Sequence, residues 1–200
     1  DIHAAVASEV FHVPQEKVDK EMRRQAKVIN FGILYGMGVN SLRAALGTTR
    51  ELAQNFYNEY FETFGTLATY LEKVKIETAR KGYTETFFGR KRSFEGIRST
   101  IPYIRASAER MAINAPIQGT GADIIKLAMS RVEKKIQELG FASEVFPLLQ
   151  VHDELVFEIK ESLVEKVAKI IEECMEHVLS KEETAGVPIL VNYSSGRSWG

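Results

Sequence analysis

The residues best suited to chemistry lie in the segment RRQAKVINFGILYG, residues 23–36. Four of them follow one another at intervals of four positions: Arg23, Lys27, Phe31 and Tyr35. On a helix such residues form a stripe along one slowly winding face. A guanidinium and an ammonium group one turn apart suit a chain of phosphates, because arginine binds two oxygens at once and lysine adds a mobile charge. The rings further along suit a flat group, so the order favours a nucleotide.

The stripe also has a simpler interpretation. Cations at this spacing usually lie on a solvated helix face, and aromatic residues at helical spacing usually pack in a core. Repulsion between Arg23 and Lys27 costs roughly a few tenths of a kcal/mol unless an anion lies between them, which favours an anionic ligand slightly. The spacing alone leaves both interpretations open.

A second group of polar residues is the triplet His152, Asp153 and Glu154, which lies between two β-rich apolar runs. Such residues are common in hairpin turns, yet a carboxylate held between two strands is also suited to Mg²⁺. Asp153 supplies one such ligand, and no second carboxylate stands out for a two-metal site. A metal-dependent phosphohydrolase would need further ligands, which the four histidines hardly provide: His3, His12, His152 and His177.

Periodicity predicts a predominantly helical α+β chain with a few antiparallel strands toward its C-terminal half. The predicted helices are residues 3–11, 19–37, 41–46, 51–64, 66–82, 102–139 and 161–180. The helix at 102–139 is expected to bend or break near APIQGTGAD, because Pro116, Gly119 and Gly121 weaken it. The predicted strands form hairpins at 83–95 and about 145–160, and a last strand is expected at 187–194.

Length and composition fit an ordinary globular protein of one domain or two small ones. The chain has 200 residues, of which 44% are hydrophobic and 26% charged. It has no apolar run of the roughly 20 residues that a membrane helix needs, and no secretory signal. A single cysteine, Cys174, indicates a reducing, cytoplasmic compartment. Because the sequence starts without methionine and inside an apparent helix, we expect a piece of a longer protein.

The net charge of -1 conceals local clusters of cations. Clustering, rather than total charge, decides whether a protein binds phosphates. The clusters are Arg23, Arg24 and Lys27; Arg90, Lys91 and Arg92; and a looser group of Arg98, Arg105 and Arg110. Acidic residues gather near the C-terminus, so we predict one basic working face and one solvated acidic face.

The segment RRQAKVINFGILYG resembles motif B of the family A DNA polymerases, and QVHDELVFE resembles motif C of the same family, in the same order. The similarity to bacterial enzymes of the polymerase I type extends to DIHAAVASEVF, AERMAINAPIQGTGADIIK and VNYSSGRSW, and so covers essentially the whole chain. Motifs in a shared order are far more specific than any one of them.

This resemblance implies template-directed DNA synthesis, in which two Mg²⁺ ions assist nucleotidyl transfer from a deoxynucleoside triphosphate (dNTP) to a primer 3′ hydroxyl. Residues 1–100 would form the fingers, with the nucleotide-binding helix at about 19–37. Residues 101–200 would form the C-terminal part of an antiparallel palm, with the metal-site hairpin at about 145–160. Primer-template DNA, dNTPs and the upstream polymerase domains would be the partners, in the bacterial cytoplasm at the nucleoid and away from membranes.

The resemblance also implies roles for single residues. His3, Arg23 and Lys27 would contact the triphosphate, and Lys27 is also the candidate general acid toward pyrophosphate. Phe31 would stack near the base and sugar, with Tyr35 at the templating position. Asp153 would be the catalytic metal ligand, with Glu154 and His152 supporting the metal site and the primer terminus. The predicted DNA contacts are Tyr35, Arg105, Arg110, Asn114, Gln118 and His152.

The family pattern places motif A, which carries the other metal-binding aspartate, just before Asp1, and the thumb further upstream. Because transfer by two metals needs both carboxylates, the resemblance predicts that these 200 residues alone have no polymerase activity. The alternative interpretation is a non-catalytic helical module that binds nucleic acid.

Overall fold

The computed structural model describes residues 1–199, which divide into two compact units. The first unit is Asp1–Ile117, and the second begins at Gln118. This division falls inside α6, the helix Pro102–Glu138. Each unit is described by itself below. The functional division into fingers at residues 1–100 and palm at residues 101–200 stays a prediction.

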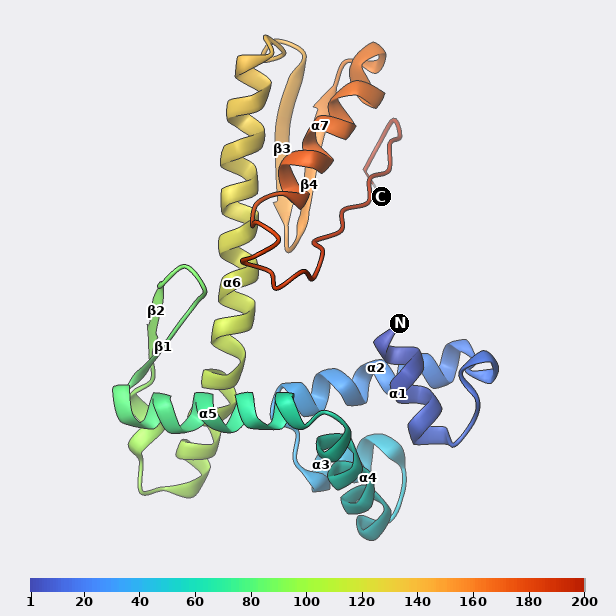
Figure 1. Cartoon of the computed structure of the whole chain (residues 1–200), viewed down its shortest axis with the longest axis vertical. Coiled ribbons are helices and arrows are strands. Elements are labelled where there is room, and N and C mark those ends of the chain that lie inside the picture. Colours follow the sequence, from blue (N-terminus) through green and yellow to red (C-terminus); the bar gives the residue numbers. More distant parts are fainter. Residues whose placement is uncertain (200) are drawn as a thin grey trace. The chain divides into compact units, whose positions relative to one another are not determined.

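Five α-helices precede α6 in the first unit (Figure 1). They are α1 (Ile2–Phe11), α2 (Lys20–Leu34), α3 (Val39–Leu46), α4 (Arg50–Thr63) and α5 (Gly65–Lys81). Short 3₁₀ turns lie at η1 (Gln15–Lys17) and η2 (Glu95–Arg98). The helices predicted from apolar spacing are therefore confirmed, although Gly65 starts α5 directly after α4 instead of lying in a longer break.

Helix ends follow local chemistry. Asp19 caps α2 by accepting a hydrogen bond from Met22 N, and Thr49 caps α4 in the same way through Leu52 N. Helix α2 ends at Leu34, three residues before the predicted end. The reason is Gly36, whose φ of +82° is left-handed and whose N–H turns back to the Ile33 carbonyl oxygen.

The core of the first unit lies among α1, α2, α3 and α4. Its buried residues are Val6, Ala7, Ala26, Ile29, Ile33, Leu42, Ala53 and Tyr60. Because Ala26, Ile29 and Ile33 occupy one side of α2, that side is committed to packing. The opposite side of the helix is left at the surface.

The first predicted hairpin is confirmed as β1 (Tyr83–Glu85) and β2 (Lys91–Ser93), which pair antiparallel. A small cluster of buried residues anchors the chain after it to α6: Phe94, Ile97, Ala108, Ala112 and Ala115. Arg98 donates from Nε to the Ala79 carbonyl oxygen at 2.7 Å and from Nη2 to the Arg80 carbonyl oxygen. This cation thus caps the C-terminal end of α5.

Helix α6 is continuous through Pro116, so the interruption expected near residues 115–123 is absent. Proline removes one backbone hydrogen bond, and the helix continues past it with buried alanines in the segments before and after. Ala112 and Ala115 precede Pro116 in the first unit, and Ala128 follows it in the second.

The second unit contains β3 (Val145–Val151), β4 (Glu154–Ile159), η3 (Glu161–Leu163) and α7 (Val164–Glu176). Strands β3 and β4 form the predicted antiparallel hairpin, with Val145 opposite Ile159 and Val151 opposite Glu154. The register shifts between Pro147 and Leu149, because proline has no N–H to give to the partner strand.

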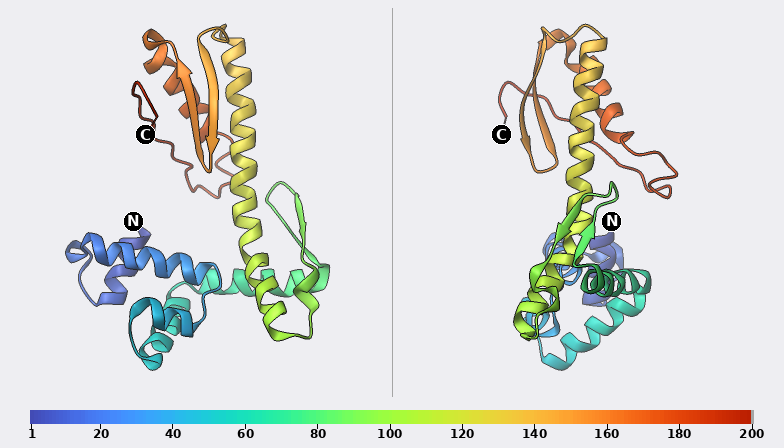
Figure 2. Two further views of the ribbon diagram at one scale, coloured as in Figure 1. Left: turned by 180° about the vertical axis from the view of Figure 1, so that it is seen from behind. Right: turned by 90° about the vertical axis from the view of Figure 1, so that its left-hand side faces the viewer.

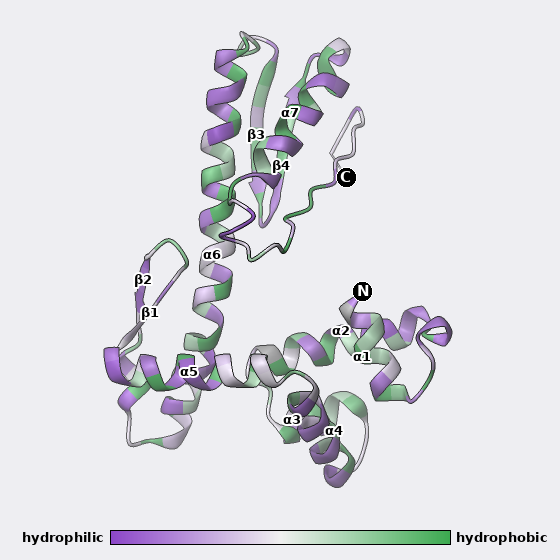
Figure 3. Ribbon diagram, viewed as in Figure 1, coloured by the Kyte–Doolittle hydropathy of each residue, from purple (hydrophilic) through white to green (hydrophobic). Residues whose placement is uncertain are grey.

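One face of this hairpin packs against α6 and α7 (Figure 2). The buried residues there are Ala128, Val132, Ile136, Val145, Val167, Ile171, Met175 and Val178. In Figure 3, hydrophobic and hydrophilic residues alternate along α6 and α7, as expected for helices that pack on one side. Phe146, Leu148 and Leu149 of β3 remain about half exposed.

The strand predicted at residues 187–194 is wrong: this segment has no regular structure. A β-rich sequence forms a strand only when a neighbouring strand takes up its backbone hydrogen bonds, and in residues 1–199 no strand pairs with it. Its Val191 N donates instead to Glu176 Oε1 at 3.1 Å. Helix α7 also ends at Glu176, before the predicted residue 180. Across residues 1–199, no helix is both long and apolar enough to cross a membrane.

Candidate functional site

The stripe on α2 lies at the surface of the first unit. Arg23, Lys27 and Phe31 are exposed, while Tyr35 at the C-cap of the helix is partly buried. Phe31 is 38% exposed, so it is not a core residue. The buried side of α2 is filled by smaller aliphatic residues, which leaves the stripe available to a ligand.

Rings and cations on this face contact one another. The Phe31 and Tyr35 rings are nearly parallel, with centroids 5.8 Å apart and an angle of 22°. Lys27 Nζ lies 5.9 Å from the Phe31 centroid, close enough for a cation–π interaction. Helix α1 adds His3, whose ring centroid is 5.4 Å from that of Phe31. The fold therefore brings His3 to the stripe, as the family resemblance implies. The position of His3 in the sequence could not show this contact.

Arg23 forms an ion pair with Asp1, with Nε and Oδ2 2.7 Å apart. The same carboxylate caps α1 by accepting from His3 N and Ala4 N. Both members of the ion pair are nearly half exposed, and exposed pairs contribute only about 0–1 kcal/mol. The ion pair therefore holds Arg23 only weakly. Neither the helix cap nor the ion pair of Asp1 was predicted from the sequence. The ion pair joins residues 22 positions apart, which local sequence patterns do not connect.

Behind His3 lies a polar network that the sequence did not reveal. Asn30 Nδ2 is 3.4 Å from His3 Nδ1, and the Tyr60 hydroxyl donates to Asn30 Oδ1. Asn30 and Tyr60 are only 9% and 5% exposed. The available signal was an asparagine on the buried side of α2, where an apolar residue is expected.

The pKa of His3 lies below its usual value of 6.5. Partial burial is the main cause, because it disfavours the charged ring, and the positive charges of Arg23 and Lys27 act in the same direction. At neutral pH His3 is therefore an uncharged ring beside two cations.

Arg110 of α6 packs at the C-terminal end of α2. A Cβ added to Gly36 would lie 2.6 Å from Arg110 Cγ, so only glycine allows this approach. The predicted DNA contacts Tyr35 and Arg110 are thus brought together. Arg105, by contrast, is already engaged, with Nε 3.8 Å from Glu109 Oε1 and Nη1 donating to the Ser99 carbonyl oxygen at 3.5 Å.

The remaining predicted DNA contacts on α6 are Asn114 and Gln118. Asn114 belongs to the first unit, and its Oδ1 is buried with no hydrogen-bond partner among residues 1–199. Gln118 is exposed and is the first residue of the second unit. The boundary between the two units falls between these two residues of α6.

The triplet at residues 152–154 occupies the tip of the β3–β4 hairpin, as predicted. His152 and Asp153 form the turn, and His152 has a left-handed φ of +53°. The turn is braced by Gln150, whose Nε2 donates to the His152 carbonyl oxygen at 2.6 Å. Glu154 Oε1 accepts a hydrogen bond of 2.9 Å from Trp199 Nε1. Trp199 is thus a further residue of this region, quoted in the sequence motif but without an assigned role.

All three residues of the triplet are exposed, and the carboxylates of Asp153 and Glu154 offer the oxygen donors that Mg²⁺ prefers. Beside them lies a groove of about 1060 Å³ lined by β4, α7 and residues 191–199. Within residues 1–199, no three His, Cys, Asp or Glu side chains gather as a complete metal site. The carboxylates of Asp153 and Glu154 fit a Mg²⁺ ion whose other ligands come from water, substrate or another part of the protein.

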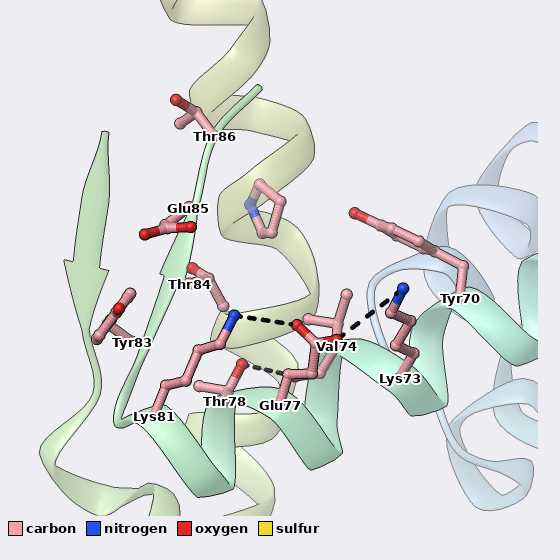
Figure 4. A pocket seen from close by; sticks show the side chains of 11 residues that line it. Tyr70, Lys73, Val74, Glu77, Thr78, Lys81, Tyr83, Thr84, Glu85 and Thr86 are labelled. Carbon is pink, nitrogen blue, oxygen red and sulfur yellow. Dashed lines mark hydrogen bonds and ion pairs between the residues drawn. The ribbon is translucent and has the colours of Figure 1, made fainter. Parts of the chain in front are cut away.

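A cavity of about 310 Å³ lies between α5 and β1, with Pro116 also in its lining (Figure 4). Lys73 and Lys81 both reach Glu77, with nitrogen to oxygen distances of 3.9 Å and 3.3 Å. Glu85 adds a second acid to the lining. The cations are therefore balanced by acids, and the cavity lacks the excess positive charge of a phosphate site.

Comparison with known proteins agrees with these features. A model of DNA polymerase family A matches residues 1–200. DNA polymerase I of Rhizobium leguminosarum is 44% identical over 199 residues, which are 100% of this chain and 20% of that protein. The thermostable DNA polymerase I of Thermus aquaticus is 43% identical, with 100% and 23% covered.

A solved structure is also similar: the POL domain of Pol1 from M. smegmatis in complex with DNA primer-template and dNTP. Its TM-score is 0.84 at 38% identity, and the match covers 90% of this chain and 31% of that one. The chain spans about a fifth of the length of the curated relatives it matches. With a family match over its whole length, the chain belongs to DNA polymerase family A.

Proposed function

We propose that this chain is the nucleotide-binding and metal-binding part of a DNA-directed DNA polymerase. The reaction is nucleotidyl transfer from a dNTP to a primer 3′ hydroxyl, assisted by two Mg²⁺ ions. The observation that carries the proposal is the exposed stripe of α2, joined by His3, in a chain that matches the polymerase family over its whole length. The M. smegmatis relative was solved with DNA primer-template and dNTP, which supports the same ligands here.

In this proposal the stripe binds the dNTP from one end to the other. Arg23 and Lys27 neutralise the phosphates, and His3 adds an uncharged contact. Phe31 contacts the base and sugar, and Tyr35 lies at the templating base. Lys27 also gives a proton to the leaving pyrophosphate, because a lysine in contact with phosphate oxygens is well placed as a general acid.

Asp153 would hold Mg²⁺, with Glu154 and His152 supporting the metal site and the primer terminus. When bound, the ions neutralise phosphate charge and favour ionisation of the attacking hydroxyl. The exposed carboxylate on a braced hairpin turn supports this assignment. The second shared carboxylate would come from outside these 200 residues, so the chain by itself would be inactive.

DNA contacts complete the proposal. Tyr35 and Arg110, which packs against the neighbouring Gly36, would contact the template, with Asn114, Gln118, Arg105 and His152 as further contacts. In the minor groove the base-pair acceptors are alike, so contacts there can check pair geometry without reading sequence. Residues 1–100 would act as fingers and residues 101–200 as the C-terminal part of the palm, joined in the cell to further polymerase domains.

Triphosphate binding by the chain tests the proposal. We expect Lys27→Ala to weaken dNTP binding about tenfold, because a hydrogen-bonded charge pair is lost. Arg24→Ala is the matched control: it removes one cation from the same helix, but Arg24 faces Glu21 and binds it through two nitrogens. Isothermal titration of each variant with a dNTP and Mg²⁺ gives the affinities.

Equal losses in the two variants would mean that only overall charge matters, and would contradict the assignment of Lys27. DNA binding without any triphosphate affinity would support the alternative function, a non-catalytic nucleic-acid-binding module.

A further inference from the structure

Three side chains from three helices form a chain of polar contacts that ends at the stripe. His3 belongs to α1, Asn30 to α2 and Tyr60 to α4. Asn30 Nδ2 lies 3.4 Å from His3 Nδ1, and the Tyr60 hydroxyl donates to Asn30 Oδ1. Asn30 and Tyr60 are buried, whereas His3 is partly exposed.

The orientation of the Asn30 amide in the structure sets the direction of each hydrogen bond. An amide oxygen only accepts, so the Tyr60 hydroxyl must be the donor to Asn30 Oδ1. This contact turns the amide nitrogen of Asn30 toward His3. An amide nitrogen only donates, so His3 Nδ1 must be the acceptor and carries no proton. In the neutral ring the proton is then on Nε2.

The surroundings of His3 keep the ring neutral. Partial burial lowers its pKa, and the positive charges of Arg23 and Lys27 of α2 act in the same direction. Asp1 is the acid of this region, and it is occupied by Arg23 and by the N-terminal amides of α1. Among the described residues, no carboxylate raises the pKa of the His3 ring.

We propose that Asn30 and Tyr60 are positioning residues, which hold His3 in the neutral tautomer with the proton on Nε2. His3 then presents an N–H donor to its ligand, where the other tautomer would present a lone pair. Toward a phosphate oxygen the donor is attractive and the lone pair is repulsive. That last step rests on the proposed function, whereas the tautomer itself does not.

The tautomer is measured on the ligand-free chain by ¹⁵N–¹H correlation spectra of the imidazole ring at a pH above the His3 pKa. We expect a protonated Nε2 and an unprotonated Nδ1 in the native chain. Asn30→Asp replaces the donor with a carboxylate that only accepts, so we expect the proton to move to Nδ1 and the His3 pKa to rise. A native chain with its proton on Nδ1, or an Asn30→Asp spectrum like the native one, would overturn the proposal.

Tyr60→Phe is the second variant, because phenylalanine preserves the ring packing and removes only the hydroxyl. Without it the Asn30 amide can turn over, and we expect both His3 tautomers to be populated. Tyr57→Phe is the matched control from the same helix, since the Tyr57 hydroxyl is not part of the network. We expect it to leave the single tautomer unchanged. An equal response in both tyrosine variants would show a general loosening of α4 and would overturn the role of Tyr60.

Triphosphate binding separates this proposal from the proposed function. If both hold, Tyr60→Phe weakens dNTP binding about threefold or more, as expected for one hydrogen bond, while Tyr57→Phe does not. If the chain binds no triphosphate at all, the proposed function fails, and the tautomer measurement still decides the positioning role. If the chain binds dNTP strongly and Tyr60→Phe mixes the His3 tautomers without weakening this binding, Asn30 and Tyr60 do not position His3 for the phosphate.

Discussion

At the scale of single residues, the dominant feature is a neutral histidine among cations. The pKa of His3 is lowered by burial and by Arg23 and Lys27. A lowered pKa means that the unfolded chain binds the proton more tightly than the folded one. The folded state is therefore more stable above pH 6.5, and this advantage is lost as the pH falls through the lowered pKa of His3.

We expect His3 to titrate below pH 6.5 in an NMR titration of the chain, and we expect its pKa to rise in Arg23→Gln, where one of the repelling charges is removed. The control is Arg24→Gln, which removes a cation that faces Glu21 instead of His3. A His3 pKa at or above the ordinary value in the native chain would contradict the account of its environment.

The same residues show how far the sequence reaches. The sequence could predict that Arg23, Lys27 and Phe31 share one helix face, because that depends only on helix periodicity, but not whether the ring of Phe31 is buried. His3, Asn30 and Tyr60 were not predictable as a network, because residues 27 and 30 positions apart meet only through the packing of α1, α2 and α4. The role of His3 came from family resemblance, and the partners behind it came from the structure.

At the scale of elements, the end of α2 couples a helix terminus to a neighbouring helix. Gly36 has a φ of +82° and faces Arg110, whereas Gly47 ends α3 with a φ of +62° and would meet nothing within 4 Å. Both glycines relieve backbone strain, but only Gly36 also makes room for a side chain of the predicted DNA-binding set.

We therefore expect Gly47→Ala to cost about 1–2 kcal/mol of unfolding free energy through strain alone. Gly36→Ala should cost about 1 kcal/mol more, because the added Cβ displaces Arg110. Urea unfolding of the two variants measures the difference. Primer-template affinity, measured by fluorescence anisotropy in buffer of fixed salt, should fall only for Gly36→Ala. Equal affinities would show that the position of Arg110 does not matter for DNA.

Helices and hairpins were predicted well, because short stretches of sequence determine them. A strand that needs a distant neighbouring strand was predicted poorly. The helices and both hairpins follow from apolar spacing, caps and turn residues. The strand expected at residues 187–194 is absent because β structure needs a neighbour, and sequence periodicity does not supply one. Pro116 was expected to bend or interrupt α6, and the structure shows no interruption between Pro102 and Glu138.

At the scale of the whole molecule, the proposed dNTP-binding residues and the proposed metal-binding carboxylate lie in different units. The stripe, His3 and Arg110 belong to the first unit, while Asp153 and Glu154 belong to the second. In the proposed function, nucleotide affinity and metal binding are therefore separable by substitutions in the two units. In the proposed reaction the second unit contributes Asp153 but still needs a carboxylate from elsewhere in the full-length protein.

We expect the 200-residue chain to bind a dNTP and to give no primer extension in the presence of Mg²⁺, because a two-metal reaction depends on both carboxylates. The positive control joins this chain to the preceding region of the Thermus aquaticus relative, and it should extend the primer until Asp153→Ala abolishes the activity. In the isolated chain Asp153→Ala should leave the affinity for a metal-free dNTP unchanged, whereas Lys27→Ala should reduce it. Extension by the isolated chain that disappears in Asp153→Ala would show that these residues hold a complete catalytic centre, and the proposed need for an outside carboxylate would be wrong.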